Sequence, residues 1–395
     1  MKKQKIIQAR SRVIGMDLHP SCFSASAFSG KSIHDATKLW THDKVDLSAL
    51  TSWAQRHLEA GDIVVMESGS NSFECSLQLT ELGVQAIVLE SFSVGKVGEA
   101  YLKTDAVDSV KIAQAYLSGL AKEVWQPDAS CRERREILAC YQRAAKDATR
   151  AQNRLTGWVT QHALKRPQGM TWKSPKALEW MLRQKAWTAS QRMLIDGMFA
   201  DLRHALSRKQ SLEAYMAEDV MNSPQWMKLL QICGLRHITV FALAAMIGNI
   251  ARFKNPKKLV TYFGLNPKVN QSGINQKSGR LAHNGRKDAR HFLVQGAQAV
   301  LKLDPKSNRI ARWGQALAYR KGKPTACIAV ARKLLTVVWY LLSGFKPEVK
   351  EETPHLRIKL AKIGRAIGKE RLQELGHEKT TDFIDVKMNF VLGVT

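Results

Sequence analysis

The stretch Val13-Ile14-Gly15-Met16-Asp17 decides the fold, because it is a short apolar run that ends in a carboxylate. A second run, Ile63-Val64-Val65-Met66-Glu67, has the same form. Apolar runs of this length are typical of buried β-strands. Carboxylates at two strand ends, in a chain with a formal net charge of +27, indicate a function rather than simple solvation. We therefore expect these strand ends to carry an acidic site.

A pair of aspartates completes the acidic set. Asp105 and Asp108 lie in Lys103-Thr104-Asp105-Ala106-Val107-Asp108, at the start of a helical pattern that runs to about Leu117. Residues three apart share one helix face, so a helical turn would place both carboxylates together. Carboxylates from separate elements can hold Mg²⁺ or Mn²⁺ against a phosphodiester. A turn or an N-cap is the ordinary explanation for each residue alone, but four in this order favour a metal site.

The composition points to a polyanionic partner. Lys and Arg number 61 against 34 Asp and Glu, and the excess is spread along the chain, as in surfaces that face nucleic acid. Six scattered cysteines form no C-x-x-C pair, which disfavours a structural zinc site. The longest apolar run, Ala326 to Leu342, is interrupted by Arg332 and Lys333. It predicts a core helix, and we expect no membrane association.

The order of the predicted elements defines the fold class of the first part. A strand at 13–16 precedes a hairpin partner at 23–28 and a weaker third strand at 38–42. Helix and strand patterns then alternate, with helices at 47–58, 73–82 and 106–117 and strands at 63–66 and 84–89. This order is expected of a ribonuclease H-like α/β domain. In that architecture the first strand, a middle strand and a late helix converge at one sheet edge.

The remainder of the chain is predicted to be mainly helical. Residues 131–164 form one long apolar stripe, which indicates either a helix packed on its own domain or a coiled-coil arm. Helices continue to Val220, and Asn222-Ser223-Pro224 marks a boundary before a helical region at 225–342. The last stretch, 346–395, is charged and predicts a peripheral helix at 356–372 followed by a tail, with no assigned role.

A basic, Gly-punctuated segment, Gly264 to Arg290, interrupts this helical region. Ser272 and Ser278 each precede a glycine, which allows the backbone to approach a phosphate closely. A serine activated there could act as a nucleophile, while the ordinary alternative is a solvated basic loop. The expected nucleic-acid-binding cations are Lys277, Arg280, Arg286, Lys287 and Arg290.

The stretch Leu229 to Thr239 resembles a helix-hairpin-helix turn, which offers backbone amides and a helix N-terminus to a phosphate. Arg236 occupies the place of the usual small residue in that motif. The segment is therefore a second candidate for contact with the nucleic-acid backbone.

Together these motifs resemble those of the DEDD insertion-sequence transposases, the bridge-RNA-guided recombinases of mobile elements. Gly15-Met16-Asp17 is similar to the opening strand of the family, Met66 to Ser70 to its glutamate motif, and Lys103 to Asp108 to its K-T-D-A-x-D signature. Tyr262 to Pro267, with Gln271-Ser272-Gly273 beyond, is similar to the second conserved domain. The tripeptide Leu18-His19-Pro20 departs from the residues usual after the first aspartate.

The resemblance implies a RuvC-like domain whose carboxylates, here Asp17, Glu67, Asp105 and Asp108, bind magnesium. It also implies a serine nucleophile, Ser272, with Ser278 ranked second. The implied partners are donor and target DNA, a structured guide RNA and further copies of the chain in a dimer or tetramer, in a prokaryotic cytoplasm near the nucleoid. The expected domains are 10–125 (RuvC-like), 126–222 (helical linker), 223–345 (transposase domain) and 346–395 (charged tail).

The predicted function is excision and integration of an insertion sequence by magnesium-assisted strand exchange through a serine. One alternative is a Holliday-junction or structure-specific endonuclease that uses the four carboxylates alone. A second alternative is a non-enzymatic nucleic-acid-binding protein. The serine distinguishes the first function from the endonuclease, because only a serine nucleophile leaves a covalent protein–DNA link.

Overall fold

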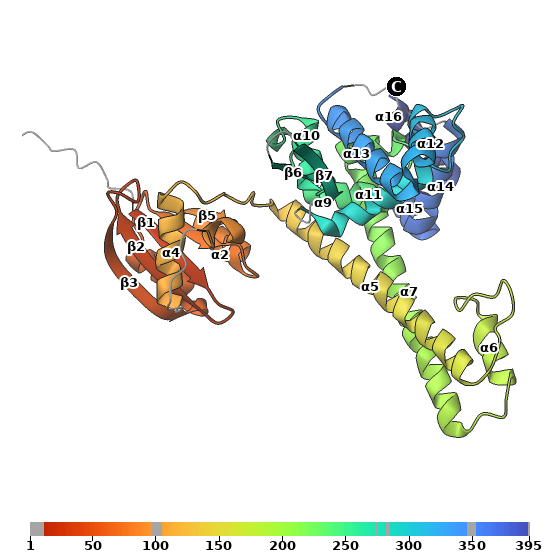
Figure 1. The fold of residues 1–395 in the computed structure, drawn as a ribbon. Coiled ribbons are helices and arrows are strands. Elements are labelled where there is room, and N and C mark those ends of the chain that lie inside the picture. The colour runs from red at the N-terminus through yellow and green to blue at the C-terminus, as the bar shows by residue number, and fades with distance from the viewer. Residues whose placement is uncertain (1–11, 97–104, 273–274, 282–284, 346–352, 394–395) are drawn as a thin grey trace, which may run out of the picture. The chain divides into compact units, whose positions relative to one another are not determined.

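The computed structural model describes residues 12–96, 105–272, 275–281, 285–345 and 353–393 (Figure 1). For residues 105–106, 268–272, 275–280, 287–288 and 353 only the backbone is described. The chain divides into two compact units, Met1–Gln126 and Pro127–Thr395, and each is described by itself. The finer division into four domains stays a prediction.

The first unit is built on a five-stranded mixed sheet in the order β3-β2-β1-β4-β5. β1, β2 and β3 are antiparallel neighbours, whereas β1, β4 and β5 run parallel. This arrangement agrees with the ribonuclease H-like order that the sequence predicts. The strands are β1 (Arg12–Leu18), β2 (Cys22–Ser29), β3 (Thr37–Asp46), β4 (Ile63–Glu67) and β5 (Gln85–Leu89).

Helices cover both faces of this sheet. On one face, Ile14 and Met16 of β1 join a core with Trp53 of α1 (Leu50–His57) and Leu79 of α2 (Ser72–Glu81). On the other face, Val13 joins a second core that includes α3 (Ser91–Val94) and α4 (Asp105–Leu117). The alternation along β1 follows from the two-residue period of a strand.

Glycine at position 15 lets α4 lie directly on β1. A Cβ atom built there would lie 2.0 Å from the backbone oxygen of Ser109 and 2.6 Å from the backbone nitrogen of Ala113. The same level of the sheet carries a buried hydrogen bond, 2.8 Å long, between the hydroxyls of Ser26 and Ser109. The helix is therefore held at one fixed height along the strand.

In the second unit, two long helices form an antiparallel arm (Figure 1). α5 (Ala129–Gln161) packs along α7 (Ala189–Asn222) of the same chain, and α6 (Lys176–Arg183) lies at the tip. The long helix therefore packs on α7 of its own chain, and dimerisation of the arm or its contact with nucleic acid stays a prediction. At the tip, Trp172 and Trp187 are buried with Phe199 in a core separate from that of the body.

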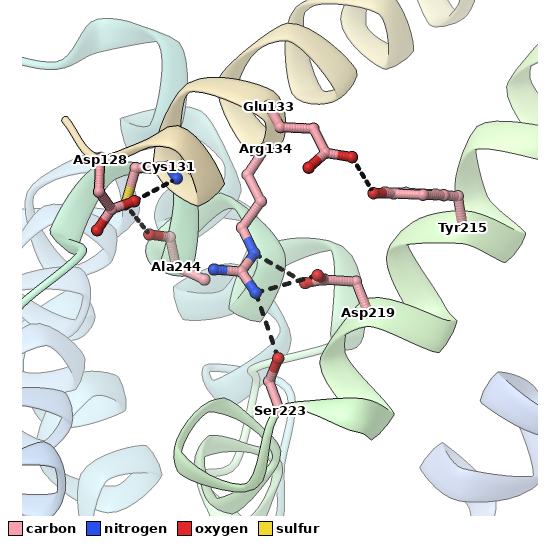
Figure 2. Close-up of polar contacts among 8 residues, drawn as sticks. All are labelled: Asp128, Cys131, Glu133, Arg134, Tyr215, Asp219, Ser223 and Ala244. Carbon is pink, nitrogen blue, oxygen red and sulfur yellow. Dashed lines mark hydrogen bonds and ion pairs between the residues drawn. The ribbon is translucent and has the colours of Figure 1, made fainter. Parts of the chain in front are cut away.

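The base of the arm is fixed by polar contacts (Figure 2). The Arg134 guanidinium donates to both Asp219 oxygens at 2.9 and 3.0 Å and to the Ser223 hydroxyl at 3.2 Å. The Tyr215 hydroxyl donates to Glu133 at 2.6 Å. A bidentate, partly buried guanidinium–carboxylate pair fixes orientation as well as distance, so α5 and α7 meet here in one register.

The body of the second unit packs around α9 (His237–Ile247), all of whose residues are buried. Val330, Leu334 and Val338 of α13 (Lys323–Leu342) are fully buried in the same core, which confirms the predicted core helix. α13 is the one helix of the described residues long and apolar enough to cross a membrane. The other elements are α8 (Pro224–Met227), α9 (His237–Ile247), α10 (Pro256–Tyr262), α11 (Lys287–Val300), α12 (Arg309–Lys321), α13 (Lys323–Leu342) and the hairpin β6 (Pro267–Ser272) and β7 (Asn275–Leu281).

The C-terminal stretch differs from the single peripheral helix and tail that the sequence suggests. It forms α14 (Thr353–Ile367), α15 (Lys369–Glu374) and α16 (Thr380–Leu392). Leu356, Phe383 and Met388 lie in the body core, because the apolar residues of these helices recur on one face and are buried against it.

Candidate catalytic site and nucleic-acid interface

Asp17 and Glu67 end neighbouring parallel strands. The β1–β4 register pairs Met16 with Met66, so the next residue on each strand is one of these acids. Met16 and Met66 face the core with α1 and α2, whereas Gly15 and Val65 face α4. Since successive residues alternate in direction, both acids point to the α4 face of the sheet. Both are half-buried.

The start of α4 lies at the same end of the sheet. The amide of Ile33, beyond the end of β2, donates to the Leu117 carbonyl at 3.2 Å, so the C-terminal end of α4 lies near the start of β1. Gly15 then meets α4 at Ser109, and the first turn of α4 lies toward the end of β1. Asp105 and Asp108 occupy that first turn. Acidic residues of three elements thus lie at one edge of the sheet.

The donor set fits a hard divalent cation, because every member is a carboxylate. The Asp108 carboxylate accepts from the Lys111 ammonium at 2.9 Å, and both side chains are about three-quarters buried. A bound cation would compete with this ammonium for Asp108. Within the described residues no group of three or more His, Cys, Asp or Glu is close enough to hold a metal, and the Asp105 side chain lies outside them.

The basic segment of the second unit is a β-hairpin rather than the loop allowed by its glycines. Ser272 is the last residue of β6 and pairs with Asn275, while Ser278 lies on β7 opposite Val269. The backbone amides and carbonyls of this polar sequence satisfy one another across the hairpin. Lys277 and Arg280 lie on β7 and Lys287 begins α11. The side chains of Ser272 and of these three cations lie outside the described residues.

Arg286 and Arg290, predicted to bind nucleic acid, also have structural contacts. The Arg290 guanidinium donates to the Gly264 carbonyl at 3.0 Å. The Arg286 amide donates to the Tyr262 carbonyl at 2.9 Å, and its guanidinium donates to the Met246 sulfur at 3.2 Å. Gly285 has φ of +102°, and an added Cβ would lie 2.6 Å from the Gly264 nitrogen. These contacts hold the segment before β6 against the start of α11.

Two further arginines that the sequence does not single out lie beside Tyr262. Arg135 of α5 donates to the Tyr262 hydroxyl at 3.5 Å and to the Ala245 carbonyl at 2.9 Å. The Arg252 guanidinium lies 4.5 Å from the centre of the Tyr262 ring. Burial lowers the pKa of both guanidinium groups, and the charge of Arg286 lowers it further. Like charges held together near the serine hairpin would favour an anion.

Both units match family models of transposases. A DEDD transposase model, described as a transposase, matches residues 14–163. The model of the transposase IS116/IS110/IS902 family matches residues 227–311. Together the two matches cover more than half of the chain. They include the acidic strand ends, α4, α9 and the serine hairpin.

Relatives with curated names are transposases as well. The transposase for insertion sequence element IS1111A of Coxiella burnetii is 24% identical over 247 residues, which are 61% of this chain and 67% of the relative. The transposase for insertion sequence element IS1328 of Yersinia enterocolitica is 26% identical over 132 residues, which are 33% of this chain and 38% of the relative.

A mixed α/β unit with acidic strand ends, joined to a helical unit with a basic hairpin, defines a DNA transposase when set beside these matches. The protein is therefore an enzyme of DNA transposition. The chain belongs to the IS110 family of DEDD insertion-sequence transposases.

Proposed function

We propose that this transposase excises and integrates its insertion sequence through a serine–DNA intermediate, with the four carboxylates assisting. The observation that carries the proposal is the placement of Asp17 and Glu67 on the α4 face, at the edge toward which the first turn of α4 is directed. On this proposal the first unit is a RuvC-like catalytic domain, and Asp105 and Asp108 complete the set. Mg²⁺, or Mn²⁺ in its place, would supply charge neutralisation at the phosphodiester when bound.

The proposed nucleophile is Ser272, with Ser278 as the second choice. Its hydroxyl oxygen attacks the phosphorus, the bond from phosphorus to one deoxyribose oxygen breaks, and that oxygen takes a proton. The phosphodiester is thereby kept as a serine ester, so no external energy source is needed. Attack by the hydroxyl of the other DNA strand reverses the step and releases the serine. Strand exchange therefore conserves the number of phosphodiester bonds.

The arginines near Tyr262 support this role. A pentavalent phosphate carries more negative charge than the ground state, and preorganised cations stabilise that charge. Arg135 and Arg252 are already half-buried and fixed by backbone carbonyls, so they need little reordering when an anion arrives. Lys277, Arg280, Arg286, Lys287 and Arg290, which follow Ser272 in the chain, are the proposed phosphate contacts.

The test compares Ser272→Ala with Asp17→Ala in the full chain, supplied with donor and target DNA. We expect both changes to abolish recombination. Only Ser272→Ala should also remove the covalent protein–DNA adduct, detected as protein-linked DNA after denaturation, while Mg²⁺ binding measured by calorimetry stays intact. Ser278→Ala is the matched control on the same hairpin.

An adduct that persists in Ser272→Ala would refute the serine assignment. Magnesium-dependent hydrolysis without any adduct in the wild-type chain would instead support the structure-specific endonuclease, and failure to bind Mg²⁺ would refute the metal site. The proposed guide RNA is tested separately by sequencing nucleic acid that co-purifies with the protein. A discrete structured RNA from the flank of the element is the expected result, and random RNA would leave only the charge attraction.

The remaining expectations are part of the same proposal. We propose that the chain acts as a dimer or tetramer in the bacterial cytoplasm, because two DNA molecules must be held at once for strand exchange. Light scattering of the complex with DNA measures the number of copies. A complex that contains a single copy would refute this part.

A further inference from the structure

A cavity of about 200 Å³ lies in the second unit where the start of α9 meets α14. Its lining includes the cations Arg236, Lys359 and Lys362, the histidines His237 and His355, and the apolar residues Ala299, Leu303 and Ile363. The described residues that line it include no Asp or Glu. Positive charge is therefore gathered around this space without an acidic side chain in the wall.

The helix end at this cavity is itself suited to an anion. α9 has 11 residues and begins at His237, with Arg236 as its N-cap and no side-chain cap hydrogen bond. The first amides of a helix have no partner within the helix, and the helix dipole makes this end positive. A cation at the N-cap adds to that positive charge instead of offsetting it. An anion would relieve both effects.

His237 supplies an independent indication of a ligand. The residue is among those that line the cavity and is 5% exposed, and its Nε2 atom is buried with no hydrogen-bond partner among the described residues. A buried polar atom without a partner is costly and calls for an explanation. In its Nε2–H tautomer a neutral imidazole can donate one hydrogen bond to an anion.

The other charged groups near His237 are already engaged. Burial, followed by the charge of Arg236, lowers the pKa of His237 to about 4, while Glu213 acts in the opposite direction and Lys209 in the same one. The Glu213 carboxylate accepts from Lys209 at 3.0 Å and from Tyr141 at 3.1 Å. Glu213, the acid that acts on the pKa of His237, is thus already paired with Tyr141 of α5 and Lys209 of α7.

α14 closes the cavity in a fixed position. The Lys359 ammonium donates to the carbonyls of Leu230 and Ile232 at 3.0 and 2.9 Å, which ties α14 to the turn before α9. Lys362 lies one turn nearer the C-terminal end of the helix, is exposed, and lines the cavity. Lys359 therefore positions the wall, and Lys362 is available to a ligand.

We propose that this cavity, the α9–α14 site, binds one phosphate of the sugar-phosphate backbone of a bound nucleic acid. The amides at the start of α9 and the His237 imidazole donate to the phosphate, and Arg236 and Lys362 balance its charge. The match to the transposase family ends at residue 311, so α14 adds a wall from outside the matched region. The proposal does not depend on Ser272, and its tests need no recombination.

The first test uses inorganic phosphate and the full chain, freed of nucleic acid, with histidine rings labelled with nitrogen-15 at pH 7.5 and constant ionic strength. The ring signal that is missing in His237→Gln should shift saturably with phosphate. Lys362→Ala should weaken the apparent affinity about three- to tenfold, as expected for one partly exposed charge. Arg365→Ala removes an exposed cation from the same helix, one turn beyond Lys362 and outside the cavity wall, and should leave the affinity unchanged.

A His237 signal that ignores phosphate, or equal effects of Lys362→Ala and Arg365→Ala, would overturn the proposal. If His237→Gln does not fold, thermal unfolding replaces the ring signal as the readout. Phosphate should then raise the melting temperature of the wild type and of Arg365→Ala more than that of Lys362→Ala. Equal increases in all three proteins would count against the site.

The second test identifies the source of the phosphate by the salt dependence of binding to duplex DNA and to single-stranded RNA. For Lys362→Ala the slope of log K against log salt should fall by about 0.9 with the duplex or about 0.7 with the single strand, the value for one lost phosphate contact. The polymer that shows the change is the partner, and Arg365→Ala should keep the wild-type slope with both. Unchanged slopes for Lys362→Ala with both polymers would refute the assignment to nucleic acid, even if free phosphate binds.

Discussion

Replacement of Gly15 by alanine tests how the acidic edge is built. The added Cβ would lie 2.0 Å from the Ser109 oxygen, where ordinary contact begins at 3.4 Å, so α4 has to retreat by about 1.4 Å. The two nearest atoms, the Ser109 oxygen and the Ala113 nitrogen, belong to the backbone, and the third, the Ala113 Cβ at 2.9 Å, has no rotamer, so no side-chain rotation relieves the overlap. Overpacking of this kind costs about 1–3 kcal/mol or more of unfolding free energy.

The displacement also moves Asp105 and Asp108 away from the strand ends. A misplacement of about 1 Å in a catalytic group can reduce the rate on the order of 10²-fold. Gly15→Ala should therefore lower recombination far more than it lowers the amount of folded protein. Amide hydrogen exchange over α4 measures the loosening, and strand-exchange assays measure the rate.

The matched control is Gly69→Ala, which lies just after β4. The nearest atom to its added Cβ is the Glu67 oxygen at 3.9 Å, an ordinary contact. This variant should show the amide hydrogen exchange of α4 and the recombination rate of the wild type. If Gly15→Ala shows wild-type protection of α4 and wild-type activity, the close contact between α4 and β1 does not set the acidic edge, and the reasoning is refuted.

Three further results are expected. Asp62→Ala should cost about 3 kcal/mol in urea unfolding of the first unit, because Asp62 is buried and accepts two bonds from Arg12; a loss below about 1 kcal/mol would contradict this. His237, with its pKa lowered to about 4, binds fewer protons folded than unfolded. Its contribution to the free energy of unfolding, up to about 3 kcal/mol, should be present above pH 6.5 and lost as the pH falls toward 4. In phosphate-free buffer, the free energy of unfolding of His237→Gln should lack this dependence on pH. Gly157→Ala, in α5 with no atom within 4 Å of its Cβ, should raise stability by about 0.5–1 kcal/mol in thermal unfolding, and a decrease would show an unrecognised contact.

The strands and the start of α4 could be predicted because their signals are local. Asp17 and Glu67 each follow a short apolar run, and the two-residue period is enough to assign their faces. The predicted strand at 38–42 is longer in the structure, from Thr37 to Asp46. The sequence does not show why residue 15 must be glycine, because the contact that requires it is with Ser109, which lies far along the chain.

The second unit was harder to predict because its important contacts are long-range. Arg135 meets Ala245 and Tyr262 only after α5 packs on the body, and no spacing between these residues marks the encounter. The serine segment has the glycines of a loop, but paired backbone groups make it a hairpin. The charge of 346–395 concealed the apolar faces of α14 and α16, which the body core buries.

The antiparallel arm restricts which insertions in α5 and α7 the fold can accept. Its helices have 33 and 34 residues, about 50 Å at 1.5 Å per residue, and each end is held by its own contacts, Arg134 with Asp219 at the base and the tryptophan core at the tip. An insertion in one helix alone would shift its residues along the other helix, so the contacts at the base and at the tip could not both form. Matched insertions of seven residues in both helices would keep the same faces together and extend the arm by about 10 Å. The arm can therefore be lengthened only by insertions of equal length in both helices.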